Sequence, residues 1–485
     1  MSREVVATER HMLDALNDTA RADEAAETLR HGLVSENGTQ WLEWDGKRWL
    51  EVPDARALEV VRQWHYDYSR DVLGNLPAKD IGRFLGIGAI SATLKLLAGI
   101  LMRRADEFDA HPHLLNVANG VLDLRTGELS RHDPHLLLTR LAPVDYKPGA
   151  THKDWQAALT ALPKSARGYA RMRFGQAITG HTPDDDTQVF LIGGGSNGKS
   201  TMLDAVRHAL GDYATVVPDE VLLARPGDHP ASLMTLKGVR LAVAEELPDG
   251  HRINVKRLKD ITGTEVITAR RMRQDFVSFP ATHSLFVSTN YLPIVSETDH
   301  GTWRRLVPLT FPREFVRGTP ARKGQRKGDR HLRTRLRRGT GGRSEAVLAW
   351  LVAGAREWFD DGMRLPLPPQ RVEDDARAWR KETDVIMRFV DDALAIESEA
   401  FTLSSELYGL FSGWQAVNGL GKWSMQTFSA RLAQHDDLAG RVELTKTYAG
   451  RGWRGIALRD DARVNVEFAR QVAHLTPAPT TITTD

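Results

Sequence analysis

The chain has 485 residues, of which 41% are hydrophobic and 26% are charged, and its 65 Lys and Arg residues nearly balance 63 Asp and Glu residues, for a net charge of +2. This composition is typical of a folded globular protein, and the length suits roughly two to four domains. Cysteine is absent, which excludes disulfides, thiolate nucleophiles and zinc sites built on cysteine. The N-terminus is charged where a secretory signal is apolar, and no apolar run is long enough to span a bilayer. We therefore expect a cytoplasmic protein that has no membrane partner.

The first 150 residues predict an N-terminal α+β domain. A charged helical opening precedes residues 40–52, where tryptophans flank an Asp45-Gly46 turn, as in a small β-hairpin. A helix-rich stretch follows. Residues 113–146 then alternate short apolar runs with Asn-Gly and Thr-Gly turns, which predicts a β-meander.

Residues 151–315 predict an α/β core with a helical lead-in. Strands that alternate with helices indicate a parallel sheet covered on both faces. Apolar strands are expected at 188–192, 239–244, 284–289 and 306–311, with helices at 199–210 and 254–261.

A glycine-rich loop follows the first of these strands and matches G-x-x-x-x-G-K-[ST]. Glycines let backbone N–H groups approach phosphate oxygens, and the next helix presents its positive end to them. Lys199 is expected to reach the β and γ phosphates of ATP, and the Ser200 hydroxyl to bind Mg²⁺. The alternative is a structural glycine turn. The predicted nucleotide-binding residues are Gly193, Gly195, Ser196, Asn197, Gly198, Lys199, Ser200 and Thr201.

Three other strands of the core carry polar residues that suit catalysis. Glu245 and Glu246 end one strand, and we assign Glu245 to Mg²⁺ and Glu246 to the attacking water as general base; helix-capping carboxylates are the alternative. Asn290 ends another, where it can bind the γ-phosphate and the attacking water or cap a turn. Arg304 and Arg305 precede the last strand and can donate bidentate bonds to phosphate.

The C-terminal third begins with a strongly basic run. Between residues 313 and 343, twelve Lys and Arg residues face only two acidic residues, a pattern that attracts polyanions or forms a solvated linker. We divide this part of the chain into a basic linker with helices at 316–382, a domain at 383–465 and a disordered tail at 466–485. In the second of these, helix-like segments at 385–395, 404–418 and 424–434, followed by a short β element, suggest a winged helix.

Taken in order, these motifs resemble the superfamily 3 helicase core of the phage and plasmid primase-helicase family, which is related to the poxvirus nucleoside triphosphatase-primases. Residues 116–146 also resemble the domain that precedes this ATPase, and residues 383–458 resemble its winged-helix module. The matching segments are GGGSNGKST at 193–201, LAVAEE at 241–246, KDITG at 259–263, ITAR at 267–270, FVSTNYLP at 286–293 and GTWRRL at 301–306.

The resemblance implies an AAA+-like P-loop ATPase that forms a hexameric ring and uses ATP and Mg²⁺. Asn290 would be the sensor of the γ-phosphate, and Arg304 or Arg305 the finger that reaches the neighbouring subunit's ATP. Residues 259–279 would grip single-stranded DNA. Two strand-like runs joined by a basic turn within this segment agree with this role. The alternative is that the basic residues protect an edge strand from aggregation. The candidate DNA-binding residues are Lys259, Arg270, Arg271 and Arg273.

We therefore expect an ATP-dependent helicase that unwinds forked DNA during replication of a phage or mobile element in a bacterial host cytoplasm. Primer synthesis is not expected, because the region before residue 110 shows no pattern of catalytic carboxylates, so a separate primase or polymerase is a candidate partner. One alternative is an ATPase that translocates or packages duplex DNA; the Asn290 strand and the arginine pair favour the ring helicase. The other is an origin-binding initiator with a nucleotide switch, against which Lys199, Glu245 and Glu246 argue.

Overall fold

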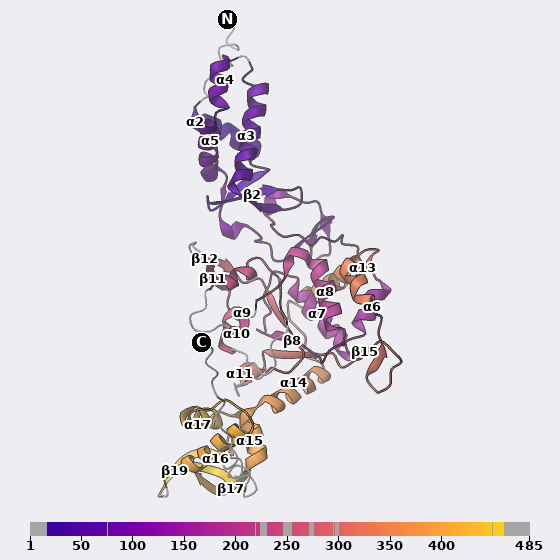
Figure 1. The fold of residues 1–485 in the computed structure, drawn as a ribbon, viewed down its shortest axis with the longest axis vertical. Helices are drawn as coiled ribbons and strands as arrows, with labels where there is room; N and C mark the ends of the chain where they lie inside the picture. Colours follow the sequence, from indigo (N-terminus) through magenta and orange to yellow (C-terminus); the bar gives the residue numbers. More distant parts are fainter. Residues whose placement is uncertain are drawn as a thin grey trace, which may run out of the picture.

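The computed structural model shows an elongated molecule with an N-terminal helical unit at one end, a central core and a C-terminal unit at the other (Figure 1). Its fold is mixed α/β, as predicted. The structure describes residues 17–74, 76–218, 220–223, 230–245, 255–270, 276–293, 295, 300–448 and 450–459.

The N-terminal unit packs helices against a four-stranded sheet of order β3-β2-β1-β4. The predicted hairpin is confirmed, because β2 and β3 pair antiparallel and Asp45 Oδ1 accepts the backbone N–H groups of Lys47 and Arg48 at 2.8 Å. The elements are α2 (Asp18–Leu29), β1 (Leu33–Glu36), β2 (Gln40–Trp44), β3 (Trp49–Val52), α3 (Asp54–Asp71), α4 (Ala78–Phe84), α5 (Ile87–Ile100) and β4 (Met102–Arg103).

Within the described part of the chain, no single helix has the length and apolar character of a membrane span. Helices α4 and α5 meet that test only when they are taken together, and they are bent by 47° relative to each other. In this structure Phe84, Ile90 and Leu97 of these helices are buried in the hydrophobic core of the N-terminal unit.

A small antiparallel sheet connects this unit to the core. Strands β5 (Leu114–Val117), β6 (Gly120–Asp123) and β7 (Leu129–Ser130) form the first part of the predicted meander. The meander then ends, and the following chain contributes a single bridge between Val117 and Ala142. Leu115 and Leu122 are fully buried in the same hydrophobic cluster as the central sheet, so this small sheet is part of the core.

The central sheet has five parallel strands in the order β14-β8-β13-β10-β9. All four predicted strands are present. The sequence missed β9, which has three residues at the edge of the sheet and none of them buried. The strands are β8 (Gln188–Ile192), β9 (Ala214–Val216), β10 (Leu241–Glu245), β13 (Ser284–Thr289) and β14 (Leu306–Thr310).

Hydrophobic clusters cover both faces of the sheet, because alternate residues of each strand point to opposite sides. Val189 and Leu191 of β8 join one cluster, whereas Phe190 and Ile192 join the other. The first face is covered by α6 (Lys153–Leu159), α7 (Arg167–Ala177), α8 (Lys199–Leu210), α12 (Leu332–Arg338) and α13 (Arg343–Asp360). The second is covered by α9 (Glu220–Leu223), α10 (Val255–Thr262), α14 (Gln370–Thr383) and the hairpin of β11 (Val266–Arg270) and β12 (Phe276–Pro280).

Helices α7 and α13 cross at a contact that requires glycine on both sides. A Cβ atom added to Gly175 would lie 2.2 Å from the Ala355 backbone nitrogen, and one added to Gly354 would lie 2.1 Å from the Arg171 carbonyl oxygen. Real Cβ atoms do not approach backbone this closely, so the two glycines set the distance between the helices.

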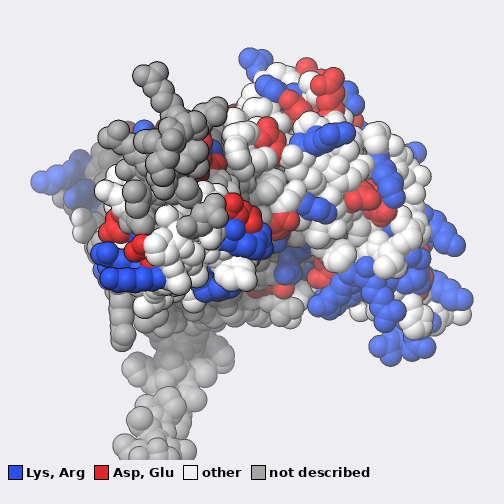
Figure 2. All heavy atoms as spheres, turned by 90° about the horizontal axis from the view of Figure 1, so that it is seen from above, with Lys and Arg blue, Asp and Glu red and all other residues white. Residues whose placement is uncertain are grey.

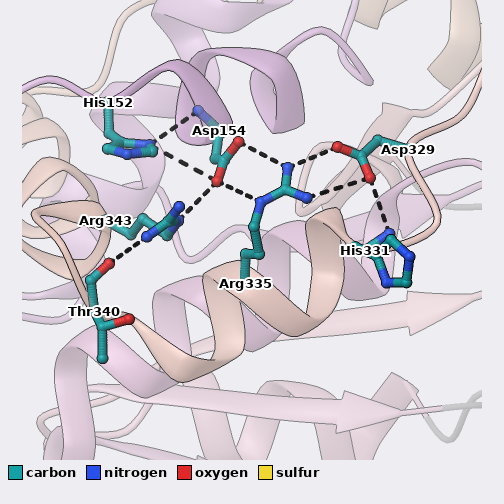
Figure 3. Close-up of polar contacts among 7 residues, drawn as sticks. All are labelled: His152, Asp154, Asp329, His331, Arg335, Thr340 and Arg343. Atoms are coloured by element: carbon teal, nitrogen blue, oxygen red, sulfur yellow. Dashed lines mark hydrogen bonds and ion pairs between the residues drawn. The ribbon is translucent and has the colours of Figure 1, made fainter.

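Part of the basic run folds onto the core through ion pairs (Figure 3). The carboxylate of Asp154 on α6 accepts hydrogen bonds from Arg335 at 2.8 Å and from Arg343 at 2.7 Å, and Arg335 also binds Asp329 at 2.6 Å. The side chain of Asp154 is 6% exposed. The two guanidinium groups hold the pKa of Asp154 well below its usual range. These arginines therefore join α12 and α13 to α6.

The C-terminal unit has its own hydrophobic core and an antiparallel sheet of order β17-β19-β18. Helices are present at the three predicted segments, but the first ends at Ala393 instead of Ala395, and a strand, β17, follows it. The elements are α15 (Val385–Ala393), β17 (Leu394–Leu403), α16 (Ser404–Val417), α17 (Met425–Ala433), β18 (Glu443–Thr447) and β19 (Gly450–Leu458).

The network around Asp154 predicts a difference in stability between two carboxylate variants. Asp154→Ala leaves two guanidinium groups without their shared partner at a buried position, and we expect a loss of about 3 kcal/mol of unfolding free energy. Asp329→Ala removes a carboxylate that is 49% exposed from the same network, and we expect a loss of about 1 kcal/mol or less. Urea unfolding of both variants measures this, and equal losses would contradict a central role for Asp154.

Candidate functional site

The glycine loop turns sharply between β8 and α8 at the carboxyl edge of the sheet. Gly195, Ser196 and Gly198 adopt left-handed backbone angles, with φ values of +45°, +49° and +86°. A Cβ atom on Gly193 would lie 2.1 Å from Nδ2 of Asn197. The loop is therefore compact, and glycine is required where it approaches itself and its neighbours.

The side chain of Lys199 is buried within this loop and bonds to the backbone of the loop and of β13. Lys199 is 4% exposed, and its ammonium donates hydrogen bonds to the carbonyl oxygens of Gly193 at 3.1 Å and Thr289 at 2.5 Å. It also donates to Oδ1 of Asn290 at 3.0 Å. The structure thus brings together Lys199, which the sequence placed in the glycine loop, and Asn290, which it placed at the end of another strand.

The amino end of α8 offers donors to an anion. Ser200 is exposed and Thr201 is half-buried at this end of the helix. The Asn197 side chain is 5% exposed; its Oδ1 accepts the backbone N–H of Lys199 at 3.2 Å, whereas its Nδ2 donates to no other described residue. A buried amide donor, a lysine and a helix amino terminus in one loop are chemically suited to bind phosphate groups.

The acidic strand β10 ends one strand away from Asn290. In the register of β10 and β13, Glu245 lies opposite Ser288. Its side chain is 42% exposed, and Oε1 accepts a hydrogen bond from Arg207 of α8 at 2.9 Å. The sequence did not indicate this partner. Glu246 lies outside the described residues, among which no group of three or more His, Asp or Glu residues is arranged to hold a metal ion by itself.

The two adjacent arginines have different surroundings at the opposite edge of the sheet. Arg305 donates to Asp186 at 2.9 Å and to the Gly301 carbonyl at 3.3 Å, whereas Arg304 is exposed and bonds to no other described residue. Both precede β14, which is parallel to β8. They are separated from the carboxyl edge by the length of β14, about 16 Å for five residues, so Arg304 does not reach the phosphate loop of its own subunit.

The predicted basic hairpin is present. Strands β11 and β12 pair antiparallel, with Arg270 opposite Phe276. The guanidinium of Arg270 lies 5.1 Å from the centre of the Phe276 ring, and Phe276 is 62% exposed. Lys259 is half-buried on α10, while Arg271 and Arg273 lie outside the described residues. The sequence reasoning did not single out Phe276, although an aromatic residue beside a basic turn is a signal for nucleic-acid binding.

Two further residues at this site were not predicted. Arg313 follows β14 on the same edge as the phosphate loop and donates to the carbonyl of Thr160, and burial and two neighbouring arginines lower its pKa. Trp379 of α14 is fully buried; its ring packs on Trp303, and its Nε1 donates to the Pro293 carbonyl at 3.0 Å. Because these contacts join distant segments, no local sequence pattern marks them.

The contrast between the two arginines leads to a testable difference in stability. We expect Arg305→Ala to lower the free energy of unfolding by roughly 1–2 kcal/mol, because Asp186 and the Gly301 carbonyl lose their donor. Arg304→Ala removes an exposed side chain and should change it by less than about 0.5 kcal/mol. Equilibrium unfolding in urea compares the two, and a larger loss for Arg304→Ala would reverse their assignment.

The chain matches two protein-family models. The model described as "D5 N terminal like" matches residues 22–161, and a model described as a family of unknown function, DUF5906, matches residues 191–305. The second match begins within β8 and contains the glycine loop, Glu245, Asn290 and both arginines.

Curated relatives of the chain come from large DNA viruses. It is 24% identical over 422 residues to "Putative helicase L207/L206" of Acanthamoeba polyphaga mimivirus, covering 79% of this chain and 44% of the relative. It is 26% identical over 327 residues to "Putative primase C962R" of African swine fever virus, covering 64% and 34%. The chain thus spans less than half the length of these relatives. A solved structure of the NrS-1 C terminal region aligns with a TM-score of 0.46 and 9% identity, covering 88% of this chain and 96% of that one.

Proposed function

Because the chain belongs to the primase-helicase family of phages and large DNA viruses, we propose that it is an ATP-driven helicase that unwinds DNA during replication of a phage or other mobile element. The observation that carries the proposal is the convergence of Lys199 and Asn290 on one point at the carboxyl edge of the sheet, with Glu245 on the neighbouring strand. Ligands bind at this edge in open α/β sheets.

The phosphates of ATP are the proposed ligand of the glycine loop. Lys199 stands 3.0 Å from Oδ1 of Asn290, so the two side chains would contact the same terminal phosphate. The amide of Asn290 would also orient the water that attacks it, with Glu246 as general base. Arg313, on the same edge, adds positive charge that would stabilise the phosphates.

The residues present also suit Mg²⁺. A magnesium ion in such sites takes one or two protein oxygens and completes its shell with phosphate and water, and it would neutralise charge that develops on the phosphates. Ser200 is exposed at the start of α8, and one oxygen of Glu245 is engaged by Arg207 while the other has no partner among the described residues. These two side chains would hold the ion.

We assign the finger role to Arg304. It is exposed and lies at the edge opposite its own phosphate loop, so it would act on the ATP of a neighbouring subunit, whereas Arg305 is held by Asp186. A finger that acts in trans requires an oligomer, and we propose a hexameric ring with an AAA+-like arrangement of subunits. The hairpin with Arg270 and Phe276 would contact single-stranded DNA, together with Lys259, Arg271 and Arg273.

The C-terminal unit is proposed to be a winged helix that binds DNA. Three helices and a three-stranded antiparallel sheet in the order α15-β17-α16-α17-β18-β19 support this. A separate primase or polymerase remains a proposed partner, and the cytoplasm of a bacterial host the proposed location. Among the alternatives, a duplex translocase or an origin-binding initiator with a nucleotide switch would not need the exposed aromatic residue on the basic hairpin.

A strand-displacement assay on a forked duplex tests the proposal. We expect the full chain to release the labelled strand when ATP and Mg²⁺ are present and not when either is omitted. Single-stranded DNA should stimulate ATP hydrolysis. Steady ATP turnover that only duplex DNA stimulates would favour a duplex translocase, and nucleotide binding without turnover would favour an initiator.

Lys199→Ala tests the phosphate loop in the same assay. We expect at least about a hundredfold lower ATP turnover, because the ammonium that stabilises the charge on the phosphates is lost. Unwinding should disappear with it. Lys237→Ala is the matched control, because that lysine is half-exposed and pairs with Glu36 in the N-terminal unit. Near-native turnover in Lys199→Ala would show that the loop is not the site of hydrolysis.

A further inference from the structure

The basic run at 313–343 contains two sets of cations with different roles. Arg333, Arg335 and Arg343 pair with carboxylates of α8 and α6. Seven others are exposed and form no ion pair with a carboxylate of the described residues; we call them the basic surface: Arg317, Lys323, Arg326, Lys327, Arg330, Arg337 and Arg338. Figure 2 shows Lys and Arg side chains gathered on the side of the core where Figure 1 places β15 (Glu314–Val316).

The folded core holds the basic surface in place. Figure 3 shows Asp154 between Arg335 and Arg343, and Arg333 donates to Asp204 of α8 at 2.8 Å. Strand β16 (Gln325–Lys327) pairs with β15, and the backbone N–H of Phe315 in β15 donates to Ser196 at 2.8 Å. The ordering entropy of these segments is therefore already lost on folding, which favours binding of a rigid partner.

The chemistry of the basic surface differs from that of the hairpin. Residues 317–338 contain no Phe, Tyr or Trp, whereas the hairpin exposes Phe276 beside Arg270. Single strands are bound by aromatic rings that stack on bases together with basic groups, but a duplex hides its bases and presents phosphates at high density. In Figure 1 the hairpin and β15 lie on opposite sides of the core, so they form two separate surfaces.

We propose that the basic surface binds the phosphate backbone of duplex DNA, as a second contact separate from the single-strand grip of the hairpin. The proposal rests on the proposed function only in that a helicase meets both forms of DNA at a fork. These cations lack carboxylate partners and lie on folded elements, and the aromatic ring beside them, Phe315 opposite Arg326, is half-buried against the core. Such a surface suits a polyanion whose bases are covered.

The test compares duplex and single-strand binding by fluorescence anisotropy over a range of salt concentrations. The variant Arg326→Ala/Lys327→Ala/Arg330→Ala should bind a blunt duplex at least about tenfold more weakly near 0.1 M salt, and its slope of log affinity against log salt should fall by about two to three. Its affinity for single-stranded DNA should stay within about twofold of the wild type. Phe276→Ala should show the reverse pattern, with weakened binding of the single strand.

A triple variant elsewhere is the matched control. Arg70→Ala/Arg104→Ala/Arg125→Ala removes the same charge from exposed arginines that pair with nearby aspartates. It should bind both DNA forms like the wild type. The inference is overturned if the first variant binds duplex DNA as tightly as this control does. It is also overturned if the first variant loses the same affinity for duplex and for single-stranded DNA. Neither of these results contradicts the proposed function if ATP-driven unwinding persists. A wild-type protein that binds no DNA would contradict both the inference and the proposed function.

Discussion

The ammonium of Lys199 is the group on which the carboxyl edge of the sheet depends. Lys199 is 4% exposed, and its ammonium donates hydrogen bonds to oxygens of Gly193, Thr289 and Asn290, so it joins the glycine loop to the end of β13. A buried ammonium is costly unless such oxygens surround it, and the loop and β13 must therefore keep their relative positions. The strand order provides this, because β13 lies directly beside β8.

The opposite edge and the C-terminal unit connect to this point through α14. Trp379 packs on Trp303, next to Arg304, and its indole donates to Pro293, three residues after Asn290. One buried side chain thus contacts both the segment that follows the proposed sensor and the segment that precedes the proposed finger. Helix α14 leads directly into the C-terminal unit through Asp384, whose carboxylate caps α15 and binds the buried His435. Any displacement between the two units must act on these contacts.

Local patterns predicted four of the five strands of the central sheet, helix α8, both hairpins and the loop, because alternation, glycine placement and turn residues are encoded within a few positions. Local patterns do not predict partners that are distant in the sequence. Asp154 and Arg335 are 181 positions apart, and from the sequence alone the basic run was equally compatible with a solvated linker. The same reason explains Arg207 beside Glu245 and the division of roles between Arg304 and Arg305. The helix predicted at 385–395 overlaps the first two residues of β17, and the rest of that strand was not predicted.

We propose that Arg304 of a neighbouring subunit completes the nucleotide site, and complementation between two inactive variants tests this proposal. Arg304→Ala subunits keep Lys199, and Lys199→Ala subunits keep the finger, so some interfaces of a mixed ring pair an intact loop with an intact arginine. We expect each variant alone to be nearly inactive and the mixture to regain part of the ATPase activity. If differently tagged subunits co-purify in mixed rings and the mixture is as inactive as its components, Arg304 does not act on the ATP of a neighbouring subunit.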